Sequence, residues 1–390
     1  MLSNKTISKT IWLISLVSLF TDMASEMLYP VMPVYLKAAG YSVVFIGVLE
    51  GFAEAIAGLG KSYFGRWSDA AGKRLPFVQL GYLLSSISKP MLAISTQWWL
   101  IFTSRFIDRA GKGMRTAPRD AMLNAETTAA NKATVFGFHR AMDTFGAVLG
   151  PLIALLFLHF YPGNYTSLFL LAFVPGVLAV GTTLLLKENK TASPKKAIPQ
   201  FHQTFTYWKQ APAGYKKLIA ALLLFAAINS SDVFLLLKMK EAGLADVSVI
   251  GIYVFCNLVY AVCAYPLGRL ADKTGMKTIF IAGLLLYAVT YTGFSFAHTM
   301  PLFTLFIATY GLYAAATEGV AKAWISSVVP AAENASAIGF YTGFQSIAAL
   351  LASTFAGFLW VYGSNQLVFL LAAVAALLVA VWLLVSFQKK

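Results

Sequence analysis

The chain has 390 residues, of which 58% are hydrophobic and only 12% are charged, whereas an average soluble domain has roughly 25% charged residues. A soluble protein needs a polar surface, so this composition excludes a soluble globule and predicts a chain surrounded mostly by lipid. The mean hydropathy of +0.70 agrees with that prediction. The same values exclude intrinsic disorder, collagen-like repeats and a disulfide scaffold.

Apolar segments follow one another along the whole chain, each long enough to cross a bilayer core of ~30 Å as a helix. Because the runs are continuously apolar, they favour helices over the alternating strands of a β-barrel. The sequence therefore predicts an all-α integral membrane protein with twelve transmembrane helices. The predicted spans are 10–36, 43–64, 76–95, 97–119, 133–158, 165–186, 217–239, 247–270, 277–298, 301–327, 334–360 and 365–386.

The net charge of +14 comes from 30 Lys and Arg against 16 Asp and Glu. Most of the basic residues lie in polar gaps on one side of the spans, for example Lys61–Arg74 and Lys187–Lys217. This asymmetry is the positive-inside bias, so both termini are expected in the cytoplasm and the chain in the inner (cytoplasmic) membrane. Topology accounts for the charge, and we expect no nucleic acid partner.

The chain is internally duplicated. The segment Gly65–Arg74 corresponds to Gly268–Lys277 at an offset of 203 (268 − 65), and Gly40 corresponds to Gly243 at the same offset. We therefore predict two pseudo-symmetric six-helix bundles, residues 1–186 and 217–390, joined by a cytoplasmic linker, residues 187–216. Transporters built from such repeats place the substrate site between the two halves.

The duplicated loop resembles the loop motif of the major facilitator superfamily, and the resemblance covers the full length of the chain. It implies a secondary transporter of that fold in which the loop acts as a gate. Glycine allows helices to approach closely, and the Asp can accept hydrogen bonds from a helix N-terminus in one packing and not in another. The motif residues are Gly65, Asp69, Gly72, Arg74, Gly268, Asp272 and Gly275.

The fifth span carries Gly146, Gly150 and Pro151, a pattern that resembles the antiporter motif of the superfamily. Two glycines four residues apart make a groove for close helix contact, and the proline removes a backbone hydrogen bond. The alternative is ordinary packing of small residues.

Ionised side chains cost ~2.5–3.5 kcal/mol at the centre of a membrane helix, so those in the spans require an explanation. We predict that carboxylates balanced between burial and nearby Arg residues carry protons. The alternative is a fixed salt-bridge network. The proton-coupling candidates are Asp22, Glu26, Asp143, Glu50 and Glu54. The substrate-binding candidates are Arg105, Arg109, Arg140, His139, Asp232, Glu318 and Tyr341.

The sequence contains no nucleotide-binding loop and no nucleophile–base pattern, so we expect no enzyme activity and no cofactor, with a proton gradient as the energy source. No His or Cys cluster predicts a metal site. The predicted function is a proton antiporter that exports a small organic molecule, a drug or a metabolite, by alternating access. The alternative is a symporter that imports a small organic anion with protons, which the arginine surplus favours. A membrane enzyme or receptor is a third hypothesis, and the resemblance implies a monomer.

Overall fold

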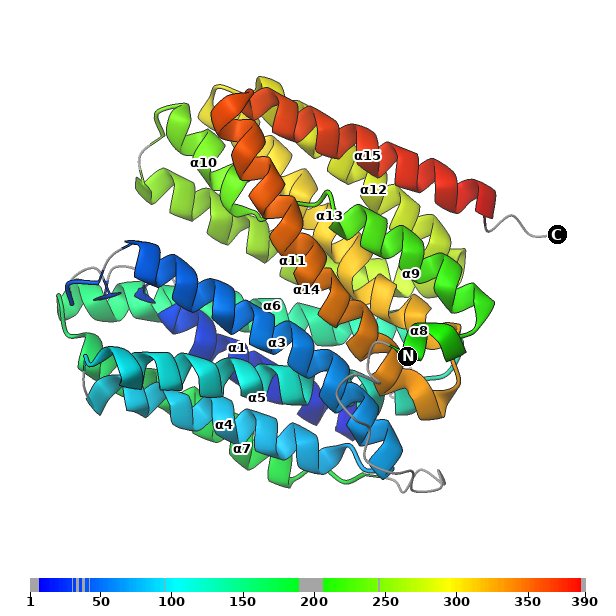
Figure 1. The fold of residues 1–390 in the computed structure, drawn as a ribbon, viewed down its shortest axis with the longest axis horizontal. Coiled ribbons are helices and arrows are strands. Elements are labelled where there is room, and N and C mark those ends of the chain that lie inside the picture. The colour runs from blue at the N-terminus through cyan, green and yellow to red at the C-terminus, as the bar shows by residue number, and fades with distance from the viewer. Residues whose placement is uncertain are drawn as a thin grey trace, which may run out of the picture. The chain divides into compact units, whose positions relative to one another are not determined.

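The computed structural model describes residues 7–29, 31–32, 35–36, 39–41, 43–94, 96–188, 206–244 and 246–386. Throughout these ranges the regular structure is helical, and no β-strand is present (Figure 1). The helices of the first half are α1 (Lys9–Leu28), α3 (Val43–Ala71), α4 (Leu75–Ile94), α5 (Trp98–Ala125), α6 (Lys132–Phe160) and α7 (Tyr165–Leu184). Most of the predicted linker lies outside the described residues.

The second half begins with a short helix, α8 (Tyr207–Gln210), at the end of the predicted linker. The longer helices that follow are α9 (Ala213–Ala226), α10 (Val233–Glu241), α11 (Asp246–Thr274), α12 (Met276–Phe296), α13 (Met300–Ser327), α14 (Asn334–Tyr362) and α15 (Asn365–Ser386). A 3-10 turn, Ala331–Glu333, precedes α14. The last predicted span, 365–386, coincides with α15.

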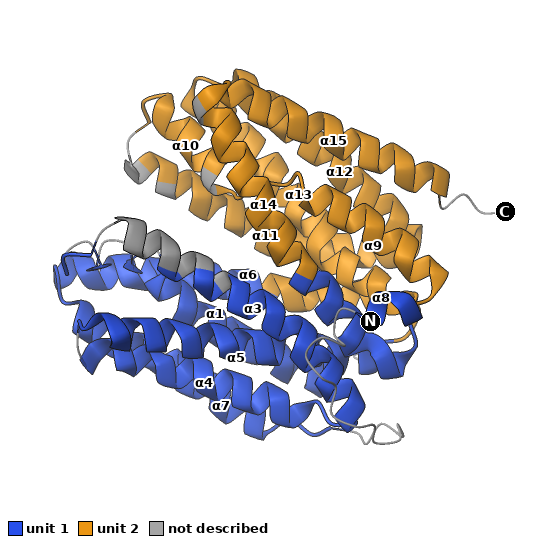
Figure 2. Cartoon of the chain, viewed as in Figure 1, with its two compact units in different colours: residues 1–127, 142–210, 329–343 blue, residues 128–141, 211–328, 344–390 orange. Residues whose placement is uncertain are grey.

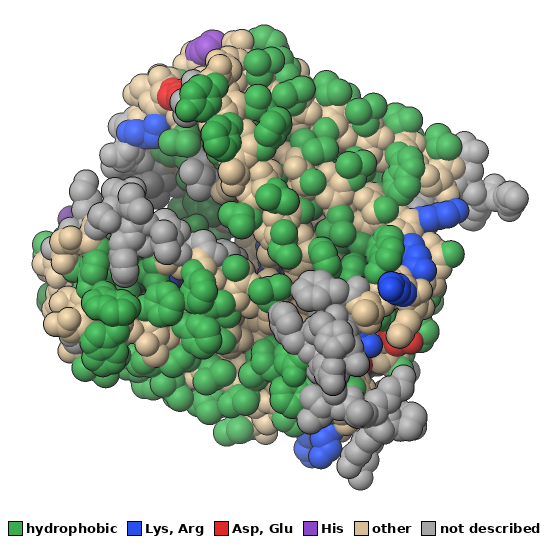
Figure 3. Space-filling view, in the orientation of Figure 1, with side chains coloured by type: hydrophobic (Ala, Val, Ile, Leu, Met, Phe, Trp, Pro, Cys, Tyr) green, Lys and Arg blue, Asp and Glu red, His purple; other side chains and the backbone are tan. Residues whose placement is uncertain are grey.

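Nine helices of the described chain are long and apolar enough to cross a membrane. α5 is not one of them, because the charged residues along it lower its hydropathy. Hydrophobic side chains cover much of the face shown in Figure 3, and Leu351, Leu378 and Val385 are each more than 60% exposed. An outer surface of this kind suits a lipid environment.

The predicted duplication appears in the backbone. Gly72 ends α3 with φ +63°, and Gly275, 203 residues later, follows α11 with φ +97°. Gly40 and Gly243, which correspond at the same offset, have φ +88° and +84°. These positive φ values favour glycine, so both halves place a glycine of this backbone conformation at corresponding positions.

The seventh predicted span, 217–239, is not one continuous helix. α9 ends at Ala226, and α10 begins only at Val233. The intervening residues include Asn229, Ser230 and Asp232, whose side chains compete with the backbone for hydrogen bonds and so favour helix ends over helix interiors. The prediction of a single helix was wrong for this reason.

The chain forms two compact units that are not continuous in sequence (Figure 2). Unit 1 comprises residues 1–127, 142–210 and 329–343, and unit 2 comprises residues 128–141, 211–328 and 344–390. The first turns of α6 thus belong with α11 and α13, while the first turns of α14 belong with α3. The predicted division at residues 187–216 is a different partition and remains a prediction.

Candidate functional site

Two glycines of α6 lie directly against the backbone of α1 in unit 1. A side-chain carbon added at Gly146 would collide with the carbonyl oxygen of Leu19, and one at Gly150 would collide with that of Met23. Helices approach this closely only where glycine leaves room. Since Asp143 precedes Gly146 by less than one turn, the glycine pair brings this carboxyl group towards α1.

Asp22 of α1 and Asp143 of α6 form a carboxyl pair. The two carboxyl groups act electrostatically on each other, and both Lys112 and Glu26 act electrostatically on Asp22. Two like charges that interact in this way favour keeping one proton between them, so the pair is a candidate proton site.

Arg119 of α5 lies beside this pair but is held mainly by another carboxylate. Its Nε and Nη2 atoms donate to Oδ1 of Asp120 at 3.0 and 2.9 Å, and its Nη1 donates to Ser18 Oγ at 2.9 Å. The distance from Nη1 to Asp143 Oδ1 is longer, 3.9 Å. Arg119 therefore pairs mainly with Asp120. Asp143 is less strongly held in its charged form and stays able to share a proton with Asp22.

A second group of charges surrounds Asp108 in unit 1. Lys89 Nζ of α4 lies 2.7 Å from Asp108 Oδ1, and it also donates to Ser25 Oγ of α1 at 3.2 Å. Arg105 and Arg109 both act electrostatically on the same carboxylate. Three cations thus face one carboxylate. Lys89 was not among the predicted site residues, although its single positive charge in the third span was the signal that could have identified it.

In unit 2, two predicted substrate-binding residues pair with each other. Arg140 Nη2 lies 2.6 Å from Glu318 Oε2. The guanidinium of Arg140 also stands 5.0 Å from the ring centre of Tyr260 and donates to its hydroxyl group. Both members of the ion pair are partly exposed, with side-chain exposures of 30% and 47%.

The other predicted residues are dispersed. Asp232 lies in unit 2 at the break between α9 and α10, His139 is buried near the start of α6, and Tyr341 is buried in the part of α14 that belongs to unit 1. Neither unit by itself gathers all the predicted substrate-binding residues. The side chains of Glu50 and Glu54 lie outside the described residues.

Asp69, near the C-terminal end of α3, binds the start of α14. Its Oδ2 atom accepts hydrogen bonds from the backbone nitrogen and the hydroxyl of Ser336, at 2.7 and 2.9 Å, and its Oδ1 accepts one from Arg74 at 3.2 Å. Gly65 lies against the carbonyl of Ala335, where a side chain would not fit. We call this contact the α3 latch. Burial raises the pKa of Asp69 to about 6, although the bonds from Arg74 and Ser336 act to lower it.

Asp272 makes the equivalent contact in unit 2, which we call the α11 latch. Its two oxygens accept hydrogen bonds from the backbone nitrogens of Ala133 and Thr134, at 2.8 and 2.6 Å, in the first turn of α6. Gly268 lies against the carbonyl of Ala133. Unsatisfied N–H groups and the helix dipole make a helix N-terminus a favourable partner for a carboxylate. In both copies the Asp accepts a backbone hydrogen bond from the start of a helix, and the action of this motif as a gate stays a prediction.

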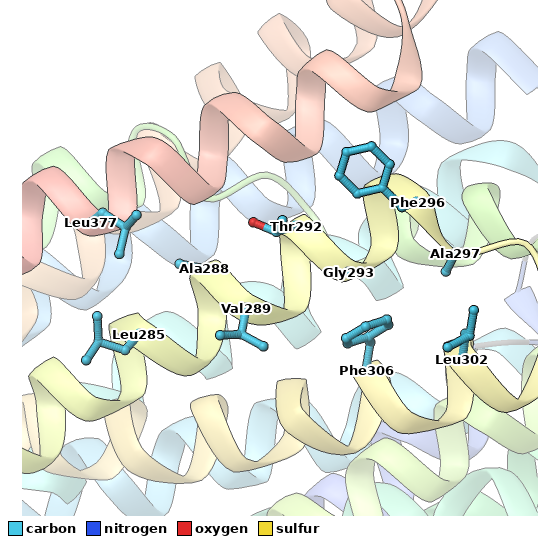
Figure 4. Close-up of a pocket in the computed structure, with 10 residues that line it drawn as sticks. All are labelled: Leu285, Ala288, Val289, Thr292, Gly293, Phe296, Ala297, Leu302, Phe306 and Leu377. Atoms are coloured by element: carbon cyan, nitrogen blue, oxygen red, sulfur yellow. The ribbon is translucent and has the colours of Figure 1, made fainter.

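A groove of about 600 Å³ on unit 2 is apolar and does not resemble a substrate site. Figure 4 shows its lining from α12, α13 and α15, with Leu285, Val289 and Leu377 on one side and Phe306 below Gly293. The first three are each more than 40% exposed. Thr292 is the only polar side chain in its lining, so this exposed apolar surface suits contact with acyl chains.

Comparisons with known proteins agree with this architecture. The model of the Major Facilitator Superfamily matches residues 14–257 and 239–389. An uncharacterized MFS-type transporter of Methanocaldococcus jannaschii is 32% identical over 391 residues, covering 98% of this chain and 96% of its relative. The multidrug resistance protein MdtH of Salmonella arizonae is 23% identical over 285 residues, 71% of this chain and 67% of that protein.

Among solved structures, that of the human organic anion transporter MFSD10 (TETRAN) matches with a TM-score of 0.84 at 15% identity, covering 96% of this chain and 98% of the other. The membrane helices, the duplicated latches and these matches define a multi-pass membrane transporter and not an enzyme. The chain belongs to the major facilitator superfamily.

Proposed function

We propose that this transporter exports a small organic molecule, a drug or a metabolite, in exchange for protons, acting as a monomer in the inner membrane with both termini in the cytoplasm. The observation that carries the proposal is the placement of the Asp22 and Asp143 carboxyl groups beside each other where Gly146 packs α6 on α1, since two carboxyl groups this close favour a shared proton. The similarity to a multidrug resistance protein supports export as the direction.

The proposed cycle uses the carboxyl pair and the latches together. Loading a proton between Asp22 and Asp143 removes a repulsion between two carboxylates, while releasing it restores that repulsion beside Lys112. Because Gly146 and Gly150 pack α6 on α1, a change at the pair acts on the contact between these helices. Breaking the latches at Asp69 and Asp272 then frees the starts of α14 and α6.

Reconstituted proteoliposomes with an imposed pH gradient test this proposal. Solute should move opposite to the protons, and Asp22→Asn or Asp143→Asn should abolish the dependence on the gradient while leaving gradient-independent exchange of solute. Glu241→Gln is a matched control, because Glu241 is exposed and bonds to Trp360 and Asn365 in unit 2. Wild-type coupling in both pair variants would refute the assignment of the proton site.

A second candidate is a symporter that imports an organic anion with protons. The observation that favours it is the excess of positive charge around Asp108, where Lys89, Arg105 and Arg109 face a single carboxylate. Arginine binds carboxylate and phosphate groups in a bidentate fork. The same proteoliposomes distinguish the candidates, because under symport an anionic solute would move in the direction of the protons.

A further inference from the structure

Side-chain oxygen atoms gather at the break between α9 and α10 in unit 2. The hydroxyl of Tyr291 on α12 lies close to those of Ser230, Tyr287 and Tyr310, and it interacts electrostatically with Asp232. We call the oxygens of these five side chains the oxygen cluster. It joins the broken seventh span to α12 and α13.

Three hydroxyl groups of the oxygen cluster are buried without a hydrogen-bond partner: those of Ser230, Tyr287 and Tyr291. Ser230 is 4% exposed and both tyrosines are 0% exposed. A buried polar group left unsatisfied costs roughly 1–3 kcal/mol, so three such groups in one place indicate a ligand that satisfies them.

Asp232 supplies the charge of the cluster. It stands at the N-cap position of α10, where an Asp side chain usually accepts a hydrogen bond from the first turn of the helix. Here it makes no such bond, and its Oδ1 atom accepts instead from the hydroxyl of Tyr310. Arg140, the cation that acts on Asp232, is itself paired with Glu318, so Asp232 has no cation of its own in this group. The residue Asp232 is exposed.

The chemistry of these groups favours a small inorganic cation. Each hydroxyl has two lone pairs and one hydrogen, so the cluster has more acceptors than donors, and hard cations take oxygen ligands of this kind. A single carboxylate suits a monovalent ion. No group of three or more His, Cys, Asp or Glu that could hold a divalent metal occurs in the described part of the chain.

An organic ammonium ion fits the site less well. The rings of Tyr287 and Tyr291 stack with centroids 3.9 Å apart, and the ring of Tyr313 stands 4.9 Å from that of Tyr287. Tyr287 and Tyr291 stack face to face and Tyr313 meets Tyr287 edge-on, so these rings form no open aromatic cage for a cation. Breaks in the membrane helices of transporters are places where Na⁺ binds through unwound backbone and nearby oxygens. We propose that the oxygen cluster binds Na⁺.

Na⁺ binding is an equilibrium property of unit 2 and does not depend on the direction or the proton coupling of transport. Thermal unfolding of the full-length protein in detergent tests it, in NaCl, KCl or choline chloride at equal ionic strength. At a Na⁺ concentration 100 times the Kd, the unfolded-to-folded ratio should fall about 100-fold relative to choline. Equal stability in the three salts would overturn the proposal.

Substitutions locate the site. Asp232→Asn should abolish the Na⁺ response, and Ser230→Ala, which removes one ligand, should raise the half-saturating Na⁺ concentration at least tenfold while preserving the fold. Thr354→Ala is the matched control, because that exposed hydroxyl bonds only to its own helix at Leu350. An unchanged Na⁺ response in Ser230→Ala would overturn the proposal even if Asp232→Asn did not fold. A pH response without a Na⁺ response would also overturn it, by identifying a proton site.

Discussion

Removing the carboxylate of Asp69 should open the α3 latch. In Asp69→Ala, the backbone nitrogen and hydroxyl of Ser336 and the guanidinium of Arg74 lose their acceptor. Hydrogen bonds to a charged group contribute roughly 1.5–3 kcal/mol each. However, the pKa raised from 3.8 to about 6 shows that burial outweighs these bonds for the charged carboxylate, so the net loss is set by the donors left without an acceptor, roughly 1–3 kcal/mol. The expected net weakening is about 2 kcal/mol, or roughly 30-fold in the open population.

Ser62 provides a reporter for this opening. Its hydroxyl donates to the carbonyl of Gly339 on α14 at 2.8 Å, and its side chain is 4% exposed, so a cysteine there reacts only when α3 and α14 separate. The assay is the rate of labelling of Ser62→Cys by a small thiosulfonate, with Cys256 and Cys263 replaced by alanine. Asp69→Ala should increase the rate about 30-fold, and Glu241→Gln should not. An unchanged rate in Asp69→Ala would show that the latch contributes nothing to closure.

The direction of the pH effect follows from the same pKa. Asp69 has a pKa of about 6 in the closed latch and about 3.8 in water, so the closed latch binds the proton more tightly. The stabilisation by protonation is complete below pH 3.8 and is lost as the pH rises through 6. Labelling at Ser62→Cys should therefore be slower at pH 5 than at pH 7, relative to Asp69→Asn, which does not titrate. Faster labelling at pH 5 would contradict this account.

Two further substitutions test the interior of unit 1. Lys89→Met removes the closest partner of buried Asp108 and should destabilise the protein by about 3 kcal/mol in thermal unfolding, while adding Asp108→Asn should restore most of the loss. Gly146→Ala should force α6 away from the carbonyl of Leu19, cost about 1–3 kcal/mol and impair proton coupling. Gly181→Ala, at a helical glycine with open space around it, is the control for both readouts.

The sequence was sufficient to predict the helices because the bilayer fixes their length and hydropathy. It predicted the end of the second span at residue 64, yet α3 continues to Ala71, because charge lowers hydropathy without ending a helix. The turn at Gly72 ends it instead. The break before Asp232 was missed, although a run of Asn, Ser and Asp was visible there, since hydropathy averaged over a window conceals a short polar interval.

Contacts between distant residues could be predicted only in kind. Asp69 was expected to accept bonds from some helix N-terminus, but its partner Ser336 lies 267 residues away, and nothing in a single sequence selects that helix. Likewise, Asp22 and Asp143 were proposed separately as proton carriers. Their pairing depends on the close contact of α1 and α6 at Gly146, which the glycine pattern allowed without specifying the partner helix.

The duplication also predicts how the two latches differ. The offset of 203 relates Asp69 to Asp272 and Ser336 to Ala133, and the two backbone hydrogen bonds correspond. Ala133 has no hydroxyl, however, and the counterpart of Arg74, Lys277, donates to the carbonyl of Leu384 instead of to Asp272.

Thus Asp69 accepts hydrogen bonds from two side chains, Arg74 and Ser336, that have no equivalent at Asp272. Asp272 instead accepts one further backbone hydrogen bond, from Thr134. Side-chain donors can be removed one at a time without disturbing a helix start. Ser336→Ala should therefore make the hydrogen bonding of the α3 latch more like that of the α11 latch. We expect Ser62→Cys to be labelled a few-fold faster in this variant than in the wild type. No change in labelling would mean that the backbone bond alone holds α3 to α14, and that the two latches are equivalent despite their different side chains.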